Sequence, residues 1–386
     1  MKLLSIEPTP SPNSMKLNVD EPLPRGLQQS YTKKEAESAP EPLRSLLAIE
    51  GVRSVFRTAD FIALDRIASA DWARVLADAR TLLSGDGGDA AQAAVPEAES
   101  FGEAHVFVQV FRGIPMQVRV KAGDREVRSA LPPKFGESVS EAAGASMIRE
   151  RMLEDLGIRY GELEDIAVEI VKELEAAYTE ERLRGLIEAA KALGPGEESA
   201  PPARPAPLSG EEIAERLESP DWQVRYAALE RIGSAEPELL PALAKALRDD
   251  NMSVRRLAVV YLGDLKDTPE AMPHMIEALR DKSAPVRRTA GDTLSDWGNP
   301  AAIGPMIESL RDANKLVRWR AARFLYEIGD ETAIDALRVA SQDSEFEIQL
   351  QAQMALERIE RGEEAAGSVW QQMTAARSQS QNQAKS

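Results

Sequence analysis

Hydrophobic positions between residues 208 and 360 recur with a period of about 31 residues. A β-branched residue opens each set, an alanine follows it at offset 4, and a large apolar residue follows at offset 8. The opening residues are Val224, Val254, Val286, Val317 and Ile348. Offsets 0, 4 and 8 lie on one face of an α-helix, so each unit is predicted to contain a helix that starts near its opening residue.

A second helix is predicted to precede each of these helices. Pro241, Pro273 and Pro305 suit its first turn, where the missing N–H has no helical partner to lose. Gly298 and Gly329 follow the other helix and are predicted to adopt a left-handed turn. Because one helix pair cannot bury its apolar face alone, the pattern predicts an all-α solenoid of five stacked pairs over residues 208–360.

Two polar positions also recur with the repeat. The residue at offset 1 is an arginine in four units, and an aspartate precedes the next helix of this kind. Since both partners recur at the same period, they are predicted to form a structural ladder of ion pairs between units. The predicted ladder consists of Arg225, Arg255, Arg287, Arg318, Asp249, Asp281, Asp312 and Asp343.

The residue at offset 2 carries the main functional prediction. Four units have Tyr226, Arg256, Arg288 and Trp319 there, and the fifth breaks the pattern with Leu350. Tyrosine, tryptophan and arginine dominate binding hot spots, so the four are predicted to form a protein-binding surface. The alternative is that these amphipathic side chains simply lie over a neighbouring helix.

The first 84 residues are predicted to form an α+β domain. Short apolar-alternating runs predict strands at residues 2–6, 16–19, 52–56 and 61–64, with the second strand pairing back on the first. Helices are predicted at residues 42–49 and 71–83, the second presenting Trp72, Val75, Leu76 and Ala79 on its apolar face. A linker rich in glycine, alanine and acidic residues is predicted at 84–100.

A middle α+β domain is predicted at residues 101–194. Alternation predicts strands at 104–111 and 116–120, joined by a hairpin loop at Gly113-Ile114-Pro115, and a third strand at 126–131. Helices are predicted at 138–156, 163–178 and 180–193. A proline-rich linker at 194–207 precedes the repeats, and a disordered tail is predicted at 361–386.

Composition narrows the possible functions. The 386 residues carry a net charge of −17, which disfavours nucleic acid and anionic membrane surfaces as partners. With no cysteine and only His105 and His274, most metal sites and acid–base constellations lack parts, so no catalytic residue, metal ligand or cofactor is predicted. No apolar run reaches the length of a membrane span, and no signal peptide is recognised, which predicts a cytoplasmic protein.

Three segments resemble known families. The run from Glu7 to Lys16, Gly51-Val52, Asp60-Phe61-Ile62 and Trp72 resemble the N-terminal domain of Nfu/NifU scaffold proteins of iron–sulfur cluster assembly. In that family a Cys-x-x-Cys motif of another domain holds the cluster, and this chain has no cysteine. The resemblance therefore implies a docking or accessory domain at residues 1–84.

The repeats and the middle domain extend the resemblance. The pattern Asp-x-x-x-x-Val-Arg-x-x-Ala at residues 249–258, 281–290 and 312–321 resembles short HEAT repeats of the phycobilisome-lyase-like kind. The runs at 106–118 and 147–162 resemble the conserved virulence factor C family, which also joins an Nfu-type N-terminus to HEAT-like repeats. That resemblance implies a role in regulating virulence-type factors, with no assigned reaction.

These observations predict a multidomain, non-enzymatic adaptor whose solenoid binds protein partners. Two alternatives stay open at this stage. One is an accessory protein of iron–sulfur cluster assembly that docks a cysteine-bearing partner. The other is a lyase or hydroxylase of the HEAT-like class, against which the scarcity of histidine and the lack of cysteine argue.

Overall fold

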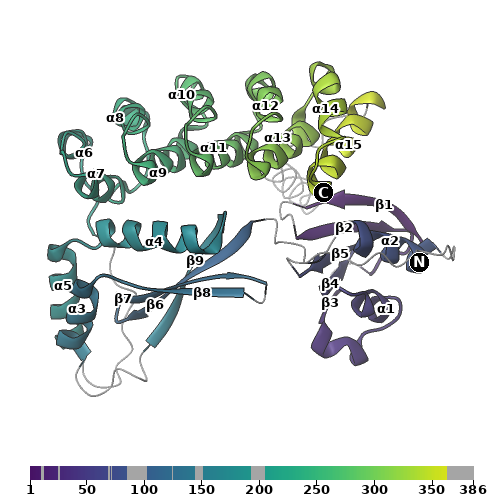
Figure 1. The fold of residues 1–386 in the computed structure, drawn as a ribbon, viewed down its shortest axis with the longest axis horizontal. Helices are drawn as coiled ribbons and strands as arrows, with labels where there is room; N and C mark the ends of the chain where they lie inside the picture. Colours follow the sequence, from purple (N-terminus) through teal and green to yellow (C-terminus); the bar gives the residue numbers. More distant parts are fainter. Residues whose placement is uncertain are drawn as a thin grey trace, which may run out of the picture. The chain divides into compact units, whose positions relative to one another are not determined.

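The structure is a computed structural model that describes residues 1–9, 13–24, 27–67, 70, 72–84, 102–123, 125–143, 151–192 and 205–362 (Figure 1). The chain divides into two compact units, each of which is described by itself. One unit combines Met1–Glu103 with Leu310–Ser386, and the other is Ala104–Ser309. Within the described residues, no helix is both long enough and apolar enough to cross a membrane.

A five-stranded antiparallel sheet forms the N-terminal part of the first unit. Its strand order is β1-β2-β5-β4-β3, so the two hairpins β1-β2 and β4-β5 lie side by side. The strands are β1 (Leu3–Pro8), β2 (Ser14–Val19), β3 (Gln28–Thr32), β4 (Val52–Thr58) and β5 (Phe61–Arg66). The predicted return of the second strand onto the first is confirmed, and β3 is an additional edge strand that the sequence did not predict.

Helices cover this sheet and complete its core. They are η1 (Lys33–Ser38), α1 (Leu43–Ala48) and α2 (Trp72–Ser84). Alternate strand residues such as Leu17, Ile62 and Leu64 are fully buried together with Trp72 and Leu46. The apolar face predicted for the second helix is therefore the face that packs into the core.

The same unit contains the last repeats. Their helices are α13 (Lys315–Ile328), η6 (Glu331–Ala333), α14 (Ile334–Ala340) and α15 (Phe346–Glu360). Helix α15 packs on α13 and α14 through the repeat positions Ile348 and Ala352, both fully buried. On another side, Phe346 and Leu350 of α15 pack against the core of the N-terminal domain. The departure of the fifth unit from the repeat pattern at Leu350 thus has a structural cause.

The second unit begins with a four-stranded antiparallel sheet of order β8-β7-β6-β9. Its strands are β6 (Glu103–Phe111), β7 (Ile114–Ala122), β8 (Arg125–Ala130) and β9 (Arg151–Tyr160). The β6-β7 turn is Arg112-Gly113, with φ of 47° and 80°, as a two-residue hairpin with right-handed strand twist requires. The loop predicted at residues 113–115 is therefore too late in the chain, because Ile114 and Pro115 already belong to β7.

Three helices pack on this sheet: α3 (Pro133–Ala143), α4 (Leu163–Ala177) and α5 (Glu180–Ala192). Helix α4 buries its apolar stripe against the valines of β6 and β7, whereas α3 and α5 form a separate cluster around Phe111, Phe135 and Ile187.

The helix predicted at residues 138–156 is wrong over its second half. Helix α3 ends at Ala143, and residues 151–160 form the edge strand β9 instead. Gly157 has a φ of 81°, which an α-helix does not accommodate, and β6 offers an unpaired edge. Pairing with another strand has therefore overridden the local helical preference of this segment.

The repeats of the second unit follow from residue 210 as an all-helical region. The first helices of the pairs are α6 (Gly210–Arg216), α8 (Leu240–Ala246), α10 (Ala271–Ala278) and α12 (Ile303–Ser309). The second helices are α7 (Trp222–Leu229), α9 (Met252–Leu262) and α11 (Ala284–Trp297). Short helices connect them: η3 (Pro237–Leu239), η4 (Gly263–Leu265) and η5 (Pro300–Ala302).

The two glycines predicted to be left-handed behave differently. Gly298 has a φ of 59° and ends α11 as predicted. Gly329 has a φ of −59°, so the left-handed prediction is wrong there. A Cβ on Gly329 would lie 2.4 Å from the carbonyl oxygen of Leu325, which shows that this position needs glycine for close packing rather than for its φ.

The domain boundaries predicted at 1–84, 101–194 and 208–360 stay predictions. The tail predicted at 361–386 and the linker predicted at 84–100 lie almost wholly outside the described residues.

Candidate functional site at the edge of the repeat helices

The structure pairs the arginines at offset 1 with aspartates of the following repeat. Arg225 binds both carboxylate oxygens of Asp249 at 2.5 and 2.7 Å, and Arg255 binds those of Asp281 at 2.6 and 3.0 Å. In the other unit, Arg318 binds Asp343 at 2.7 and 3.0 Å.

Each arginine also holds its own repeat together. Arg255 donates to the carbonyl oxygens of Asp249 and Asp250, and Arg287 donates to that of Asp281 at 2.8 Å. Each ladder aspartate accepts a backbone N–H two residues on: Asp249, Asp281, Asp312 and Asp343 all do so. In Asp249, Asp281 and Asp343, the same carboxylate therefore accepts a backbone hydrogen bond within its loop and forms an ion pair with the arginine of the preceding repeat.

The residues at offset 2 are buried, which corrects the predicted surface. Tyr226, Arg256, Arg288 and Trp319 have exposed fractions of 3%, 7%, 4% and 3%. A binding surface for another protein must be accessible, and these side chains are not. Of the two interpretations of the sequence, the structure favours side chains that lie over a neighbouring element. For four of the five units that element belongs to another domain of the chain.

Arg256 is bound by the middle domain. Its Nη2 donates to both carboxylate oxygens of Glu173 on α4, at 2.9 and 3.0 Å, and both side chains are buried. Arg159 of β9 approaches the same carboxylate at 3.7 Å. Tyr226 of α7 lies beside the Glu173 carboxylate. Side chains from two repeat helices, α7 and α9, and from strand β9 therefore surround this one glutamate of α4.

Burial dominates the electrostatics of this cluster. It lowers the pKa of Arg159, with the neighbouring Arg256 cation acting in the same direction. Burial, followed by the Glu173 carboxylate, raises the pKa of Tyr226 well above its usual value. For Arg256, burial is the largest influence and acts to lower the pKa, but Glu173, Tyr226 and Glu169 together outweigh it and the pKa is raised. The arginine therefore stays charged although it is desolvated.

Burial also shifts the pKa of the neighbouring carboxyl group of Glu169. Its pKa is raised by burial and then by the charge of Glu173 one turn along α4. Two glutamates on one half-buried face are tolerated because Arg256 and Arg159 face them.

The remaining members of the row have different neighbours. The Arg288 guanidinium lies 4.2 Å from the ring centroid of Tyr160 on β9, a cation–π contact with the middle domain. Leu350 packs against the core of the N-terminal domain within its own unit. Both domains that precede the repeats in sequence thus contact the offset-2 row.

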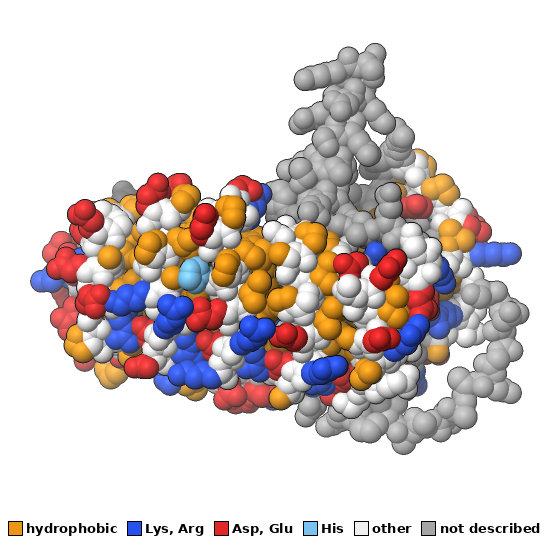
Figure 2. All heavy atoms as spheres, turned by 90° about the horizontal axis from the view of Figure 1, so that it is seen from above, with side chains coloured by type: hydrophobic (Ala, Val, Ile, Leu, Met, Phe, Trp, Pro, Cys, Tyr) orange, Lys and Arg blue, Asp and Glu red, His pale blue; other side chains and the backbone are white. Residues whose placement is uncertain are grey.

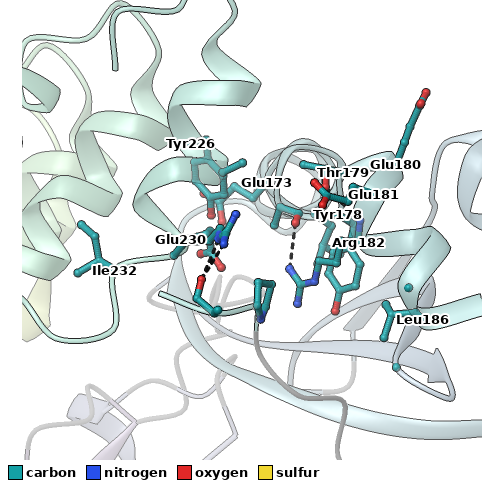
Figure 3. Close-up of a pocket in the computed structure, with 18 of the residues that line it drawn as sticks. Glu173, Tyr178, Thr179, Glu180, Glu181, Arg182, Leu186, Tyr226, Glu230 and Ile232 are labelled. Atoms are coloured by element: carbon teal, nitrogen blue, oxygen red, sulfur yellow. Dashed lines mark hydrogen bonds between the residues drawn. The ribbon is translucent and has the colours of Figure 1, made fainter. Parts of the chain in front are cut away.

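A cleft of about 1890 Å³ lies beside this cluster in the second unit (Figure 3). Its lining includes Tyr226 and Glu230 from α7 and the adjoining turn, and Tyr178 and Arg182 from the opposite side. Arg182 lies 3.8 Å from the ring centroid of Tyr178 and donates to the carbonyl oxygen of Ala177. Arg184 and Arg216 also line the cleft, are exposed, and form no ion pair within the described residues.

The face formed by the first helices is different in character. Figure 2 shows it over α6, α8 and α10, where acidic and basic side chains alternate beside a strip of apolar ones. Exposed ion pairs connect neighbouring first helices, namely Lys245 with Glu218, Arg248 with Glu277 and Arg280 with Glu308.

Glu173 and Tyr160 were not predicted as site residues. Glu173 could have been found, because it occupies a position of the apolar stripe that Leu163, Ile166 and Ile170 mark on α4. A charge within such a stripe requires a partner. Tyr160 gave no signal, since it lies between the helices predicted at 138–156 and 163–178. His274 lies 3.9 Å from Glu277, and the described residues contain no group of three metal-ligating side chains.

Comparisons with known families cover most of the chain. The family described as "Scaffold protein Nfu/NifU N terminal" matches residues 4–86, "Virulence factor" matches residues 109–187, and "HEAT repeats" matches residues 210–290 and 272–357. These matches and the two sheets followed by repeat helices define a multidomain HEAT-repeat protein with an Nfu-type N-terminal domain.

Comparisons with individual proteins are near full length. The chain is 49% identical to YpgR of Bacillus subtilis (strain 168), covering 98% of this chain and 99% of YpgR. It is 38% identical to conserved virulence factor C of Staphylococcus saprophyticus, covering 97% of this chain and 98% of that protein. The chain belongs to the conserved virulence factor C family. Among solved structures, protein SAV1430 of Staphylococcus aureus matches at 35% identity with a TM-score of 0.20, covering 21% of this chain and 98% of that one.

Proposed function

We propose that the protein is a non-enzymatic adaptor that binds a protein partner in the cleft between its middle domain and its first two repeats. The observation that carries this proposal is the size and lining of the cleft. Small-molecule pockets commonly measure about 300–1,000 Å³, and this cleft measures about 1890 Å³. That volume suits a segment of polypeptide better than a metabolite.

The lining also supports a protein partner. Arginine is enriched in binding hot spots, and Arg182, Arg184 and Arg216 all line the cleft. Repeat proteins commonly use their stacked helices as extended binding surfaces. The Staphylococcus relatives are named for virulence, so we propose that the complex has a regulatory rather than a catalytic role in this family.

A charge reversal in the cleft tests the proposal. The variant combines Arg184→Glu with Arg216→Glu, two exposed side chains on α5 and α6 whose replacement removes no ion pair among the described residues. Proteins retained from cell lysate by the full chain would be identified, purified and titrated by calorimetry. We expect the variant to bind the relevant partner at least about tenfold more weakly, because each lost hot-spot contact contributes about 1 kcal/mol or more.

The matched control is Arg248→Glu, which reverses the charge of an exposed arginine outside the cleft, on the face of the first helices. It should leave the affinity within about twofold, since exposed pairs contribute little. An affinity that is the same for wild type and the cleft variant would contradict the site. Retention of no protein above the tag-only background would contradict the adaptor function itself.

A further inference from the structure

The Nfu-like domain carries a second feature that the cleft does not explain. Arg66, at the end of β5, is only 2% exposed although it is charged. Its Nε donates to Asn13 Oδ1 at 3.2 Å, and its Nη1 donates to the carbonyl oxygen of Ala70 at 2.6 Å. The guanidinium carbon lies 5.1 Å from the ring centroid of the buried Trp72. The N-terminal domain itself therefore fixes the position of this arginine.

The remaining nitrogen of Arg66 binds a carboxylate from the other end of the chain. Its Nη2 donates to Glu347 Oε1 at 2.8 Å, and Glu347 belongs to α15. Phe346 and Leu350 of the same helix pack against the domain's hydrophobic core. One helix thus presents an aromatic residue, a carboxylate and a leucine at positions i, i+1 and i+4 to a surface with a ready-made cation.

The fifth repeat is specialised for this contact. None of the other four units has a glutamate at the position of Glu347, and none has a leucine at the position of Leu350. They carry Gln223, Ser253, Pro285 and Leu316 at the first position, and Tyr226, Arg256, Arg288 and Trp319 at the second. The repeat function of α15 uses a different face, where Ile348, Ala352 and Ala355 are fully buried. The two roles of α15 are therefore carried by separate residues.

We propose that the Nfu-like domain is a receptor for helices of the pattern Phe-Glu-x-x-Leu, that α15 is its built-in occupant, and that a helix of this pattern from a partner protein replaces α15 there. The mode is that of an amphipathic helix laid on an apolar surface, with Arg66 selecting a carboxylate. Asn13, which ends the proline-rich Glu7–Asn13 segment, is assigned the role of positioning Arg66.

This receptor surface shares no residue with the cleft. Whether a partner helix can replace α15 depends on how strongly the tethered α15 competes. A tethered segment competes with an effective concentration on the order of mM. A free helix displaces it when the ratio of its concentration to its dissociation constant exceeds the ratio of this effective concentration to the dissociation constant of the α15 contact. Phe346 and Leu350 are only partly buried in the contact, so the built-in occupant leaves room for a better one.

The test uses the full chain and a labelled peptide. The peptide has the sequence of residues 343–362 with Ile348→Lys, which blocks packing into a repeat stack and leaves the receptor pattern intact. The vacated variant carries Phe346→Ala, Glu347→Ala and Leu350→Ala. We expect fluorescence anisotropy to show at least tenfold tighter peptide binding to the vacated variant than to wild type, because α15 no longer competes.

Two further changes establish the chemistry. Adding Arg66→Ala to the vacated variant should weaken binding at least tenfold, and a peptide with Glu347→Gln should bind the vacated variant at least fivefold more weakly. Circular dichroism melts establish that each variant is folded. Should the triple change disturb folding, the single change Glu347→Gln in the full chain should still strengthen peptide binding severalfold over wild type.

Peptide binding that is equal for wild type and the folded vacated variant would overturn the proposal. So would binding that survives Arg66→Ala unchanged, since the peptide would then be held elsewhere. Neither outcome bears on the cleft, whose test uses different residues and a different ligand.

Discussion

Replacing Arg256 by alanine should lower the free energy of opening at the contact between α4 and α9 by about 3–5 kcal/mol. Arg256 supplies both hydrogen bonds that Glu173 receives from the repeats, and both side chains are buried. Without the arginine, the glutamate is left as a buried charge with Arg159 at 3.7 Å as its remaining cation. We place the expected effect at the lower end of the range because that cation remains.

The readout should be local, because a chain of several domains does not unfold in one step. Hydrogen exchange followed by mass spectrometry reports opening in peptides of α4, α7 and α9 separately from the rest. Exchange in the N-terminal domain should be unchanged, since that domain belongs to the other unit.

A paired substitution separates charge from packing. Replacing Arg256 by methionine and Glu173 by leucine removes both charges and keeps most of the volume, and such exchanges are often neutral or stabilising. The double variant should therefore regain most of the protection lost in Arg256→Ala. If it were as unstable as the single variant, the contact would depend on the geometry of the arginine stem and not on the compensation of a buried charge.

The periodic part of the fold was accessible from the sequence because its signal is internal to each unit. Positions such as Val254 and Ala258 are fully buried as their spacing predicts, since a repeat packs mainly on its neighbours. The paired arginines and aspartates followed for the same reason: Arg255 and Asp281 recur together at the repeat period and meet in the structure.

The offset-2 row could not be placed in the same way. Its composition of arginine and aromatic residues is that of a binding surface, and these residues do bind, but to Glu173 and Tyr160 of the same chain. The spacing of a repeat says nothing about which other domain covers it. Similarly, the segment that forms β9 has no alternation of its own, and its pairing with β6 is a property of the tertiary fold.

The ladder arginine Arg255 should contribute far more stability than the surface arginine Arg248, although both connect neighbouring repeats. Arg255 is 3% exposed, donates to both oxygens of Asp281 and donates to two backbone carbonyls. Its replacement by alanine leaves these acceptors without their donor in a buried site, which costs about 2–4 kcal/mol. Arg248 and Glu277 are 63% and 50% exposed, so Arg248→Ala should cost no more than about 0.5 kcal/mol.

The two variants form a matched pair, because each removes one arginine from the second repeat and one ion pair with the third. Thermal melts of the full chain rank them, and hydrogen exchange in α9, α10 and α11 locates the loss. Arg255→Lys should recover only part of the stability, since an ammonium group cannot bind Asp281 through two parallel hydrogen bonds while also reaching both carbonyls. Equal melts for Arg255→Ala and Arg248→Ala would mean that the buried ladder stabilises the stack no more than its solvent-exposed counterpart.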